Sequence, residues 1–517
     1  LIGIIVYYVI PKKVQWIWLL IMSYSYYFSF SNHITVLCML FTTITVYLGG
    51  RWLDRINVKS KNYLAMNKES LSREDKKNYK EKVKHNKRMV VVLMLLLTFG
   101  QLAGVKYLNF IISNVDSLVL AIGHGQYFEP LNILLPIGIS FYTFQSVSYI
   151  IDIYQGKYSS EKNVFKLALF VSFFPQLLQG PIGRFNRLGV QLYEGHAFDL
   201  RQVQFGLQRI GWGFFKKVVL ADRVALAVNE LFVNYTNYGG FYNIFAVLLY
   251  SVQLYMDFSG GIDIVIGTAQ MFGITMDENF RQPFFSKSIG EFWRRWHITL
   301  GTWMKDYIFY PMSLSKKMNK FGKWSKKHFG NTFGRTLPIC FANIVIFFIV
   351  GIWHGAAWKY IAYGMYNGLI IAFSNLMEPV YHKGIAFFHI DPERRYWKAF
   401  QIFRTFVLIN LGWYFDMATS FSAALSMMKS SILDLHISQI TDGSMLKLVS
   451  LRDLVIVLIG CLIVLIVSIL KEKNINIREA IARKPLPVRW ILYYGLIVII
   501  LIWGFTGAMQ GFIYANF

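Results

Sequence analysis

Long apolar runs separated by short polar stretches make up most of this chain. A helix that crosses about 30 Å of hydrocarbon needs about 20 largely apolar residues. The runs predicted to span are 14–30, 34–49, 89–106, 131–151, 165–178, 241–258, 338–353, 357–373, 403–415, 454–470 and 490–503. Runs 108–122 and 205–219 could span, re-enter or lie flat. The pattern predicts an all-α, polytopic membrane protein with about 11 to 14 membrane segments.

Composition supports this class of protein. Of the 517 residues, 55% are hydrophobic and 17% are aromatic, more than a soluble globular domain usually carries. The three cysteines lie within apolar runs, so we predict packing residues rather than a disulfide framework or a metal site; they are Cys38, Cys340 and Cys461. The apolar start, residues 1–10, is interpreted as part of a membrane helix, because no small-residue cleavage pattern follows it.

The charge is strongly positive and unevenly distributed. The chain has 53 Lys and Arg against 28 Asp and Glu, and the basic residues crowd into 51–88, 316–335 and 471–489. Basic loops between apolar runs follow the positive-inside rule, which places them in the cytoplasm, where they can contact anionic membrane lipid. We therefore predict one membrane domain over 1–517 with basic cytoplasmic loops at 51–88 and 313–335, and no nucleic-acid partner. The segment 51–88, which has no Gly or Pro, could be a solvated helix or disordered.

Two Trp-rich stretches each hold one histidine at predicted membrane depth. His297 lies in EFWRRWHITLGTWMKDYIFY, residues 291–310, and His354 lies in GIWHGAAW, residues 351–358. An ionisable group within the membrane is costly and is a functional hypothesis by default. A buried histidine can also simply satisfy a local hydrogen bond, so that alternative stays open for each residue alone.

Residues around His297 suggest a substrate site. If 291–300 is helical, Arg294 shares a face with His297, and guanidinium groups grip phosphate well, although ordinary snorkelling to the membrane surface is an equal alternative. Trp293, Trp296 and Trp303 suit the membrane–water boundary. Asp306 falls on the opposite helical face from His297. The predicted substrate-binding residues are Arg294, Arg295, Trp293, Trp296, Trp353 and Asp306.

Other polar groups interrupt the apolar runs. Gln145, Ser148 and Asp152 share one helical face, which either packs against another helix or lines a wet cavity. The stretch 173–185, FFPQLLQGPIGRF, predicts a broken or re-entrant element near a cavity, because Pro and Gly free backbone groups that must be satisfied.

Charged residues also fall in the stretches 211–223 and 253–273. Lys216 and Lys217 beside aromatic residues suit a flat interfacial helix. Asp257 and Asp263 lie on different faces, with Gly260 and its neighbouring glycine expected to break the helix between them. These carboxylates could serve acid–base chemistry, bind a coupling ion or form structural ion pairs.

The histidines define the chemistry that the sequence supports. If His297 and His354 face one cavity, a neutral histidine there is a suitable base for drawing a proton from an attacking hydroxyl. The chain has no GxSxG nucleophile motif, so direct acyl transfer from a thioester to an alcohol is the economical reaction. Two histidines are too few ligands for zinc, and no metal is expected.

Several segments resemble the membrane-bound O-acyltransferase superfamily, and within it the bacterial alginate O-acetyltransferase branch. They are EFWRRWHITLGTWMKDYIFYP, GIWHGAAW, LPIGISFYTFQSVSYIIDIYQG, FFPQLLQGPIGRF and the closing residues 512–517. The resemblance implies tilted helices around a tunnel, with His354 catalytic and His297 as the second functional histidine. It also implies a bacterial plasma or inner membrane location and no bound cofactor.

The same resemblance implies the substrates and a partner. Acetyl-CoA is the expected donor, an extracellular or cell-wall polysaccharide the expected acceptor, and an extracytoplasmic SGNH-type acetyltransferase the expected partner. Met312 follows Tyr310 and Pro311 where that branch usually has a Gly-Gly turn, and Asn367 stands where relatives often have His. These departures leave the acceptor open.

Three alternatives remain at this point. The first is D-alanyl transfer to teichoic acid from a carrier-protein thioester. The sequences of the two histidine motifs resemble this branch less than they resemble the polysaccharide O-acetyltransferase branch. The second is a transporter or lipid flippase that uses Asp152, Asp257 and Asp263 as ion sites, although no internal repeat supports it. The third is an assembly scaffold with inactive histidines.

Overall fold

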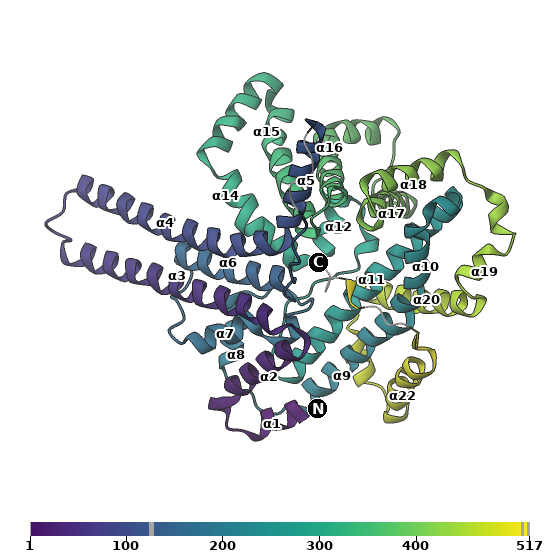
Figure 1. Ribbon diagram of the computed structural model, residues 1–517, viewed down its shortest axis with the longest axis horizontal. Helices are drawn as coiled ribbons and strands as arrows, with labels where there is room; N and C mark the ends of the chain where they lie inside the picture. Colours follow the sequence, from purple (N-terminus) through teal and green to yellow (C-terminus); the bar gives the residue numbers. More distant parts are fainter. Residues whose placement is uncertain (1, 124–128, 508–510, 514–517) are drawn as a thin grey trace. The chain divides into compact units, whose positions relative to one another are not determined.

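A computed structural model describes residues 2–123, 129–507 and 511–513 of the chain (Figure 1). Within those residues the regular structure is helical, with one isolated β-bridge between Phe280 and Trp296. The all-α prediction is confirmed. Of the closing segment 512–517, residues 514–517 lie outside the described part.

The chain divides into two compact units. Unit 1 comprises Leu1–Gln204 and Thr268–Asp277, and unit 2 comprises Phe205–Gly267 and Glu278–Phe517. The helices of unit 1 are α1 (Ile2–Val9), α2 (Gln15–Phe30), α3 (His33–Met66), α4 (Arg73–Lys106), α5 (Leu108–Ala121), α6 (Ile139–Gln155), α7 (Val164–Ser172) and α8 (Val190–Tyr193). Two helices, α9 (Leu200–Phe214) and α11 (Gly240–Met271), contribute to both units.

Unit 2 holds the remaining helices, joined by short turns. They are α10 (Asp222–Val233), α12 (Ile289–Arg295), α13 (Ile298–Met304), α14 (Tyr310–Ser313), α15 (Lys316–His354), α16 (Trp358–Phe387), α17 (Arg395–Met417), α18 (Phe421–Leu433), α19 (Ser444–Leu448), α20 (Leu451–Glu472), α21 (Ile477–Ala482) and α22 (Leu486–Trp503).

The first basic segment is helical rather than a loop. Helices α3 and α4 run side by side and end together at a short turn (Figure 1). Ser72 begins α4 by accepting a hydrogen bond from the Asp75 N–H (3.0 Å), and Tyr63 stacks on Tyr79 across the pair with ring centroids 4.3 Å apart. Of the two possibilities for 51–88, the structure has the solvated helix, because capping and cross-helix packing continue both helices beyond their apolar halves. The cytoplasmic position of the segment stays a prediction.

The second basic segment is helical as well. Helix α15 begins at Lys316, where the Ser315 hydroxyl accepts from the Met318 N–H (3.1 Å). It is kinked at Gly330, whose φ of 72° only glycine adopts easily. The predicted loop at 313–335 is therefore two helical arms joined at a glycine.

Six helices of the described chain are long and apolar enough to cross a membrane: α3, α4, α11, α15, α20 and α22. Two shorter apolar stretches are Leu108–Ala121 and Val164–Gln176. Other predicted segments fall in helices that are shorter or more polar, such as α6 with 17 residues. The larger number of 11 to 14 segments stays a prediction.

Helices α15 and α16 cross at a glycine contact that places His354. A Cβ on Gly351 would lie 2.5 Å from the Tyr360 carbonyl oxygen, and one on Gly364 would lie 2.2 Å from the Phe347 carbonyl oxygen. Only glycine allows two backbones to approach this closely. Because α15 ends at His354, the crossing fixes that histidine against α16.

Helix α11 is continuous, so the expected break at its two central glycines does not occur. A Cβ on Gly260 would lie 2.9 Å from the Gly213 carbonyl oxygen on α9. The glycine therefore serves close helix packing and leaves the helix intact.

Candidate active site

His297 lies in a tight turn between α12 and α13 of unit 2. Its backbone has φ 46° and ψ 53°, a left-handed conformation that is costly for a residue with a Cβ. The Ile298 N–H donates to the Asn279 carbonyl (3.0 Å), which ties this turn to the segment before α12. The continuous helix considered for 291–300 does not form, so Arg294 does not share a helical face with His297.

Asn279 also determines which nitrogen of His297 carries the proton. The Thr299 N–H donates to Asn279 Oδ1 (3.0 Å), and the Thr299 hydroxyl donates to the same atom (2.9 Å). That atom is therefore an oxygen, and His297 Nδ1, which lies 3.2 Å from it, is the donor. Nε2 is then the unprotonated nitrogen.

Burial keeps His297 neutral. The residue is 2% exposed and lies outside the six candidate spans. Removal from water, with the nearby His354 as a smaller cause, lowers the pKa of His297 from 6.5 to about 3. The side chain is therefore an uncharged imidazole at physiological pH.

His354 faces a buried carboxylate. Its Nδ1 lies 3.5 Å from Asp416 Oδ1, and both side chains are nearly inaccessible to water. The Tyr250 hydroxyl donates to Asp416 Oδ2 (2.7 Å), which orients the carboxylate. A carboxylate at Nδ1 favours the tautomer with the proton on that nitrogen and stabilises the imidazolium that forms when Nε2 accepts a proton.

Trp353 lies between the two histidines. Its ring centroid is 5.6 Å from that of His297 and 5.1 Å from that of His354. Tyr363 of α16 also packs against His354, with ring centroids 5.2 Å apart. Two histidines 57 positions apart in the sequence are thus brought to one aromatic side chain, and their catalytic roles stay a prediction. That both histidines line one cavity stays a prediction.

The two arginines beside His297 have different environments. Arg294 is exposed. Arg295 is half-buried and forms ion pairs with Glu291 (2.8 Å) and with Glu472 at the end of α20. Arg295 therefore links two helical segments, and its predicted role in substrate binding would require it to give up at least one carboxylate.

The predicted tryptophan and aspartate positions lie at different depths. Trp296 and Trp303 are 2% and 3% exposed, so they pack inside the protein. The prediction that they lie at the membrane–water boundary is therefore wrong for these two side chains. The Trp293 indole N–H donates to Asn367 Oδ1 (3.0 Å), so the asparagine that departs from the family pattern holds a tryptophan in place. Asp306 is half-buried on a π-helical turn after α13. The substrate-binding roles stay predictions.

In unit 1 the stretch 173–185 is broken as predicted. Helix α7 ends at Ser172, and the Gln176 side chain donates to Gln145 Oε1 (2.9 Å) of the predicted polar face of α6. Gln145 in turn donates to the Phe170 carbonyl (2.6 Å), which satisfies a backbone group near the end of α7. These amides hold the break together.

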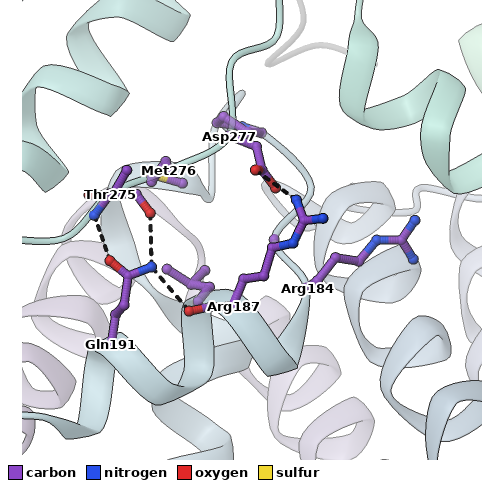
Figure 2. A pocket seen from close by; sticks show the side chains of 9 residues that line it. Arg184, Arg187, Gln191, Thr275, Met276 and Asp277 are labelled. Carbon is purple, nitrogen blue, oxygen red and sulfur yellow. Dashed lines mark hydrogen bonds and ion pairs between the residues drawn. The ribbon is translucent and has the colours of Figure 1, made fainter. Parts of the chain in front are cut away.

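The same stretch leads into a cavity of about 350 Å³ (Figure 2). It is lined by Pro181, Gly183, Arg184, Arg187, Leu188, Gln191, Thr275, Met276 and Asp277, all in unit 1. The prediction of a broken element beside a cavity is confirmed.

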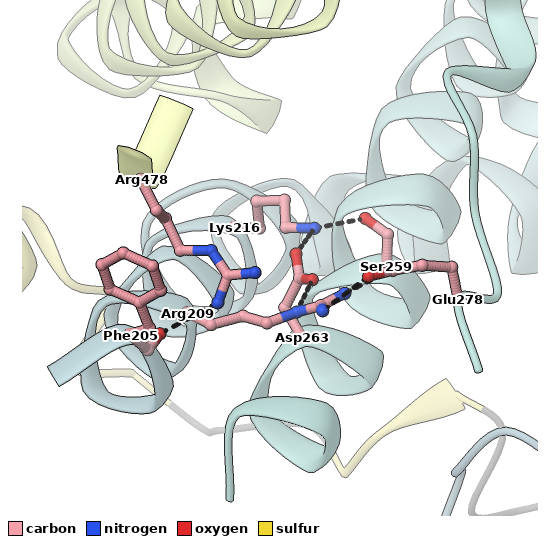
Figure 3. Close-up of polar contacts among 7 residues, drawn as sticks. All are labelled: Phe205, Arg209, Lys216, Ser259, Asp263, Glu278 and Arg478. Carbon is pink, nitrogen blue, oxygen red and sulfur yellow. Dashed lines mark hydrogen bonds and ion pairs between the residues drawn. The ribbon is translucent and has the colours of Figure 1, made fainter. Parts of the chain in front are cut away.

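Asp263 in unit 2 is the centre of a buried ion-pair network (Figure 3). It accepts from Lys216 Nζ (2.7 Å) and Arg209 Nε (2.8 Å), while Arg209 also grips Glu278 with both terminal nitrogens (2.7 and 2.6 Å). Lys216 further donates to the Ser259 hydroxyl (2.8 Å). The predicted interfacial position of Lys216 is wrong, because it lies buried against α11.

The other two acidic residues considered as ion sites are also paired. Asp257 forms an ion pair with Lys217, which bonds Asp222 as well (2.8 Å). Asp152 pairs with Lys157 (2.7 Å). These pairs favour structural roles for the carboxylates over coupling-ion sites.

Asp416 and Asn279 were not among the residues predicted from sequence. Asp416 follows the apolar ending GWYF of α17, and an acid beside an apolar run is a signal that could have flagged it. Asn279 carries no comparable signal, because a lone asparagine before a loop is common. Among the described residues, no group of three or more His, Cys, Asp or Glu side chains is placed to hold a metal ion.

The sequence of this chain is similar to those of known acyl-transferring membrane proteins. Residues 158–415 match the family model described as MBOAT, membrane-bound O-acyltransferase family. The chain is 33% identical over 325 residues to a probable alginate O-acetylase of Pseudomonas putida, covering 62% of this chain and 60% of that protein. It is 30% identical to a peptidoglycan O-acetyltransferase of Helicobacter pylori, covering 67% and 65% of the two chains. It is 28% identical to a teichoic acid D-alanyltransferase of Bacillus subtilis, covering 63% and 83%.

The fold and the paired histidines define a polytopic, all-helical membrane protein with a buried imidazole centre. The chain belongs to the membrane-bound O-acyltransferase family. It spans about three fifths of the length of the alginate O-acetylases that it matches.

Proposed function

We propose that this protein is a membrane O-acyltransferase that moves acetyl groups from cytoplasmic acetyl-CoA across the membrane for O-acetylation of an extracellular or cell-wall polysaccharide. The relatives named as alginate O-acetylases and a peptidoglycan O-acetyltransferase support the reaction class. An extracytoplasmic SGNH-type acetyltransferase is the proposed partner, and a tunnel between tilted helices is the proposed path.

The contrast between the two histidines carries the assignment of roles. His354 has the Asp416 carboxylate at Nδ1, which stabilises its protonated form, whereas His297 has the neutral amide of Asn279. His354 is therefore the better general base, because a base must hold a proton in the transition state. His297 is neutral and presents an unprotonated Nε2, so it can accept a hydrogen bond from another N–H or O–H group of a substrate.

The proposed reaction is a direct acyl transfer. His354 Nε2 takes the hydroxyl proton as the hydroxyl oxygen bonds to the thioester carbonyl carbon. The carbon–sulfur bond then breaks, and the departing sulfur takes up the proton from His354. Atoms and charge balance without a metal or a redox cofactor.

Acetyl-CoA turnover by the purified protein in nanodiscs tests this proposal. We expect wild type to release free CoA thiol when an acceptor polysaccharide and its partner are present, and His354→Ala to lose about 10²-fold or more. His382→Ala is a matched control, because that histidine is 75% exposed on α16. A wild type that neither binds nor turns over acetyl-CoA under these conditions would refute the donor assignment.

D-alanyl transfer is the second candidate function. It is supported by similarity to the teichoic acid D-alanyltransferase of Bacillus subtilis, which the match covers over 83% of its length. The histidine chemistry is the same, and the donor is a carrier-protein thioester. Turnover of the carrier thioester with none of acetyl-CoA would favour this alternative.

A further inference from the structure

The cavity in unit 1 has the chemistry of an anion site. Arg187 lies on the π-helical turn Phe185–Gly189, Arg184 is the extended residue just before that turn, and both line the cavity (Figure 2). Asp277 is the lone acidic residue in the lining. A volume of about 350 Å³ is within the range of roughly 300 to 1,000 Å³ that is common for small-molecule sites.

The Gln191 side chain holds two walls of this cavity together. Gln191 Nε2 donates to the carbonyls of Arg187 and Thr275 (both 3.1 Å), and the Thr275 N–H donates to Gln191 Oε1 (2.8 Å). Three hydrogen bonds from one amide thus join the segment 275–277 to the turn that carries Arg187. The Arg187 guanidinium is therefore not needed as the link between these segments.

Arg187 is available to a ligand. Its ion pair with Asp277 (3.0 Å) has side chains that are 67% and 40% exposed. Exposed ion pairs contribute little to stability. A phosphate presents more negative charge and more acceptor oxygens than a carboxylate, and the planar guanidinium fork matches it. A phosphate can therefore compete with Asp277 for Arg187.

Packing places the cavity on the same side as the basic arm of α3. Phe185, next to Arg184, packs on Tyr158 with ring centroids 5.2 Å apart. Two residues further on, the Ser160 hydroxyl bonds Arg51 and Asp54 of α3 (both 3.3 Å). Arg51 begins the most basic segment of unit 1, which the positive-inside rule assigns to the cytoplasm.

We propose that this cavity binds the phosphate-bearing end of the cytoplasmic acyl donor through Arg184 and Arg187. The proposal rests on the proposed function for the identity of the donor. Asp277 pairs with Arg187 in this structure, and the phosphate takes the place of the Asp277 carboxylate.

Equilibrium binding to the full chain in nanodiscs tests this assignment. The two probes are CoA, which carries phosphates, and pantetheine, which carries none. We expect Arg184→Gln and Arg187→Gln each to weaken CoA binding about tenfold or more, as loss of a charge-assisted hydrogen bond should, without changing pantetheine binding. Arg55→Gln is the matched control, because it removes an exposed charge from the same basic side of unit 1.

Asp277→Asn provides a test with the opposite sign. It removes the competing carboxylate, so CoA should bind more tightly than to wild type, a gain that misfolding cannot produce. Weaker CoA binding by Asp277→Asn, or arginine variants that bind CoA as Arg55→Gln does, would overturn the proposal.

A comparison of two kinds of nanodisc distinguishes binding of CoA from binding of an anionic lipid headgroup. Nanodiscs with and without anionic lipid are compared, and retained lipid is quantified by mass spectrometry. Arginine variants that lose bound anionic lipid but keep CoA affinity would make this a lipid headgroup site and overturn the donor assignment. A wild type that binds neither CoA nor pantetheine would instead refute the proposed donor itself.

Discussion

Replacing Asp416 by asparagine is the substitution that most sharply probes the proposed base. Asparagine has nearly the same shape, and its side-chain oxygen can still accept the hydrogen bond from Tyr250. Its amide N–H would then face His354 Nδ1, where the carboxylate oxygen lies at 3.5 Å. The substitution therefore removes a buried negative charge and reverses the tautomer of His354 with little change in packing.

The size of the effect follows from these two changes. Asp416 stabilises the imidazolium that forms when His354 takes up the proton. Loss of a charge-assisted interaction of this kind costs about 1.5 to 3 kcal/mol, which is about 10- to 150-fold in rate. Reversal of the tautomer places the proton on Nε2, which then cannot accept one, and the comparable change in serine proteases costs about 10⁴-fold. We expect Asp416→Asn to lower kcat by about 10³- to 10⁴-fold with KM nearly unchanged.

Thioester turnover at saturating donor measures this loss, and thermal unfolding in detergent checks that the variant folds. Tyr250→Phe is a graded control, because it removes one hydrogen bond to Asp416 and leaves the charge and the tautomer intact; about a tenfold loss is expected. An Asp416→Asn protein that unfolds at the wild-type temperature and keeps wild-type kcat would refute the role of the carboxylate and, with it, of His354 as the base.

Further predictions concern stability and the surroundings of the site. Asn279→Leu should lower kcat about 10- to 100-fold, measured in the same turnover assay, because His297 loses the acceptor that sets its tautomer. The pKa of His297 is about 3 in the folded protein and near 6.5 in the unfolded chain. Between these pH values the unfolded chain binds one more proton, so the free energy of unfolding falls as the pH drops from about 6.5 towards 3. His297→Gln should flatten this fall, which melting temperatures measured across the pH range would show. Gly351→Ala should cost about 1 to 3 kcal/mol by forcing α15 from α16, whereas Gly384→Ala, with open space around its Cβ position, should be neutral or slightly stabilising in the same unfolding measurement. Asp263→Asn should cost about 3 to 5 kcal/mol by leaving two buried cations short of a partner, which denaturation in detergent would detect.

The helical class and the two histidine motifs could be predicted from sequence because they rest on local signals. Apolar runs of span length require helices in a membrane, and a histidine among tryptophans in such a run is conspicuous. The break at 173–185 was equally readable, since Pro and Gly act on their own backbone. Whether the basic segment 51–88 is helical could not be decided from sequence, because charge indicates that a segment is solvated and does not determine its secondary structure.

The partners of the histidines could not be read from the sequence. Asn279 meets His297 because the chain folds back on itself around α12. Asp416 meets His354 because α15 and α17 both pack on α16 in unit 2. The backbone at His297 is left-handed. The sequence gives no signal for this conformation, because neither Gly nor Asn occupies the position. Tertiary packing imposes that conformation, and it overrides the helical periodicity on which the pairing of Arg294 with His297 depended.

The central claim is that His354 and His297 act as one unit around Trp353 in acyl transfer. Single-turnover release of thiol from the acetyl donor, for His354→Ala, His297→Ala and the double variant, tests it most directly. Residues that act as a unit are strongly non-additive, so the double variant should be no slower than His354→Ala by more than about threefold. A His354→Ala protein that releases thiol at the wild-type rate would contradict the account, and so would single losses that multiply in the double variant.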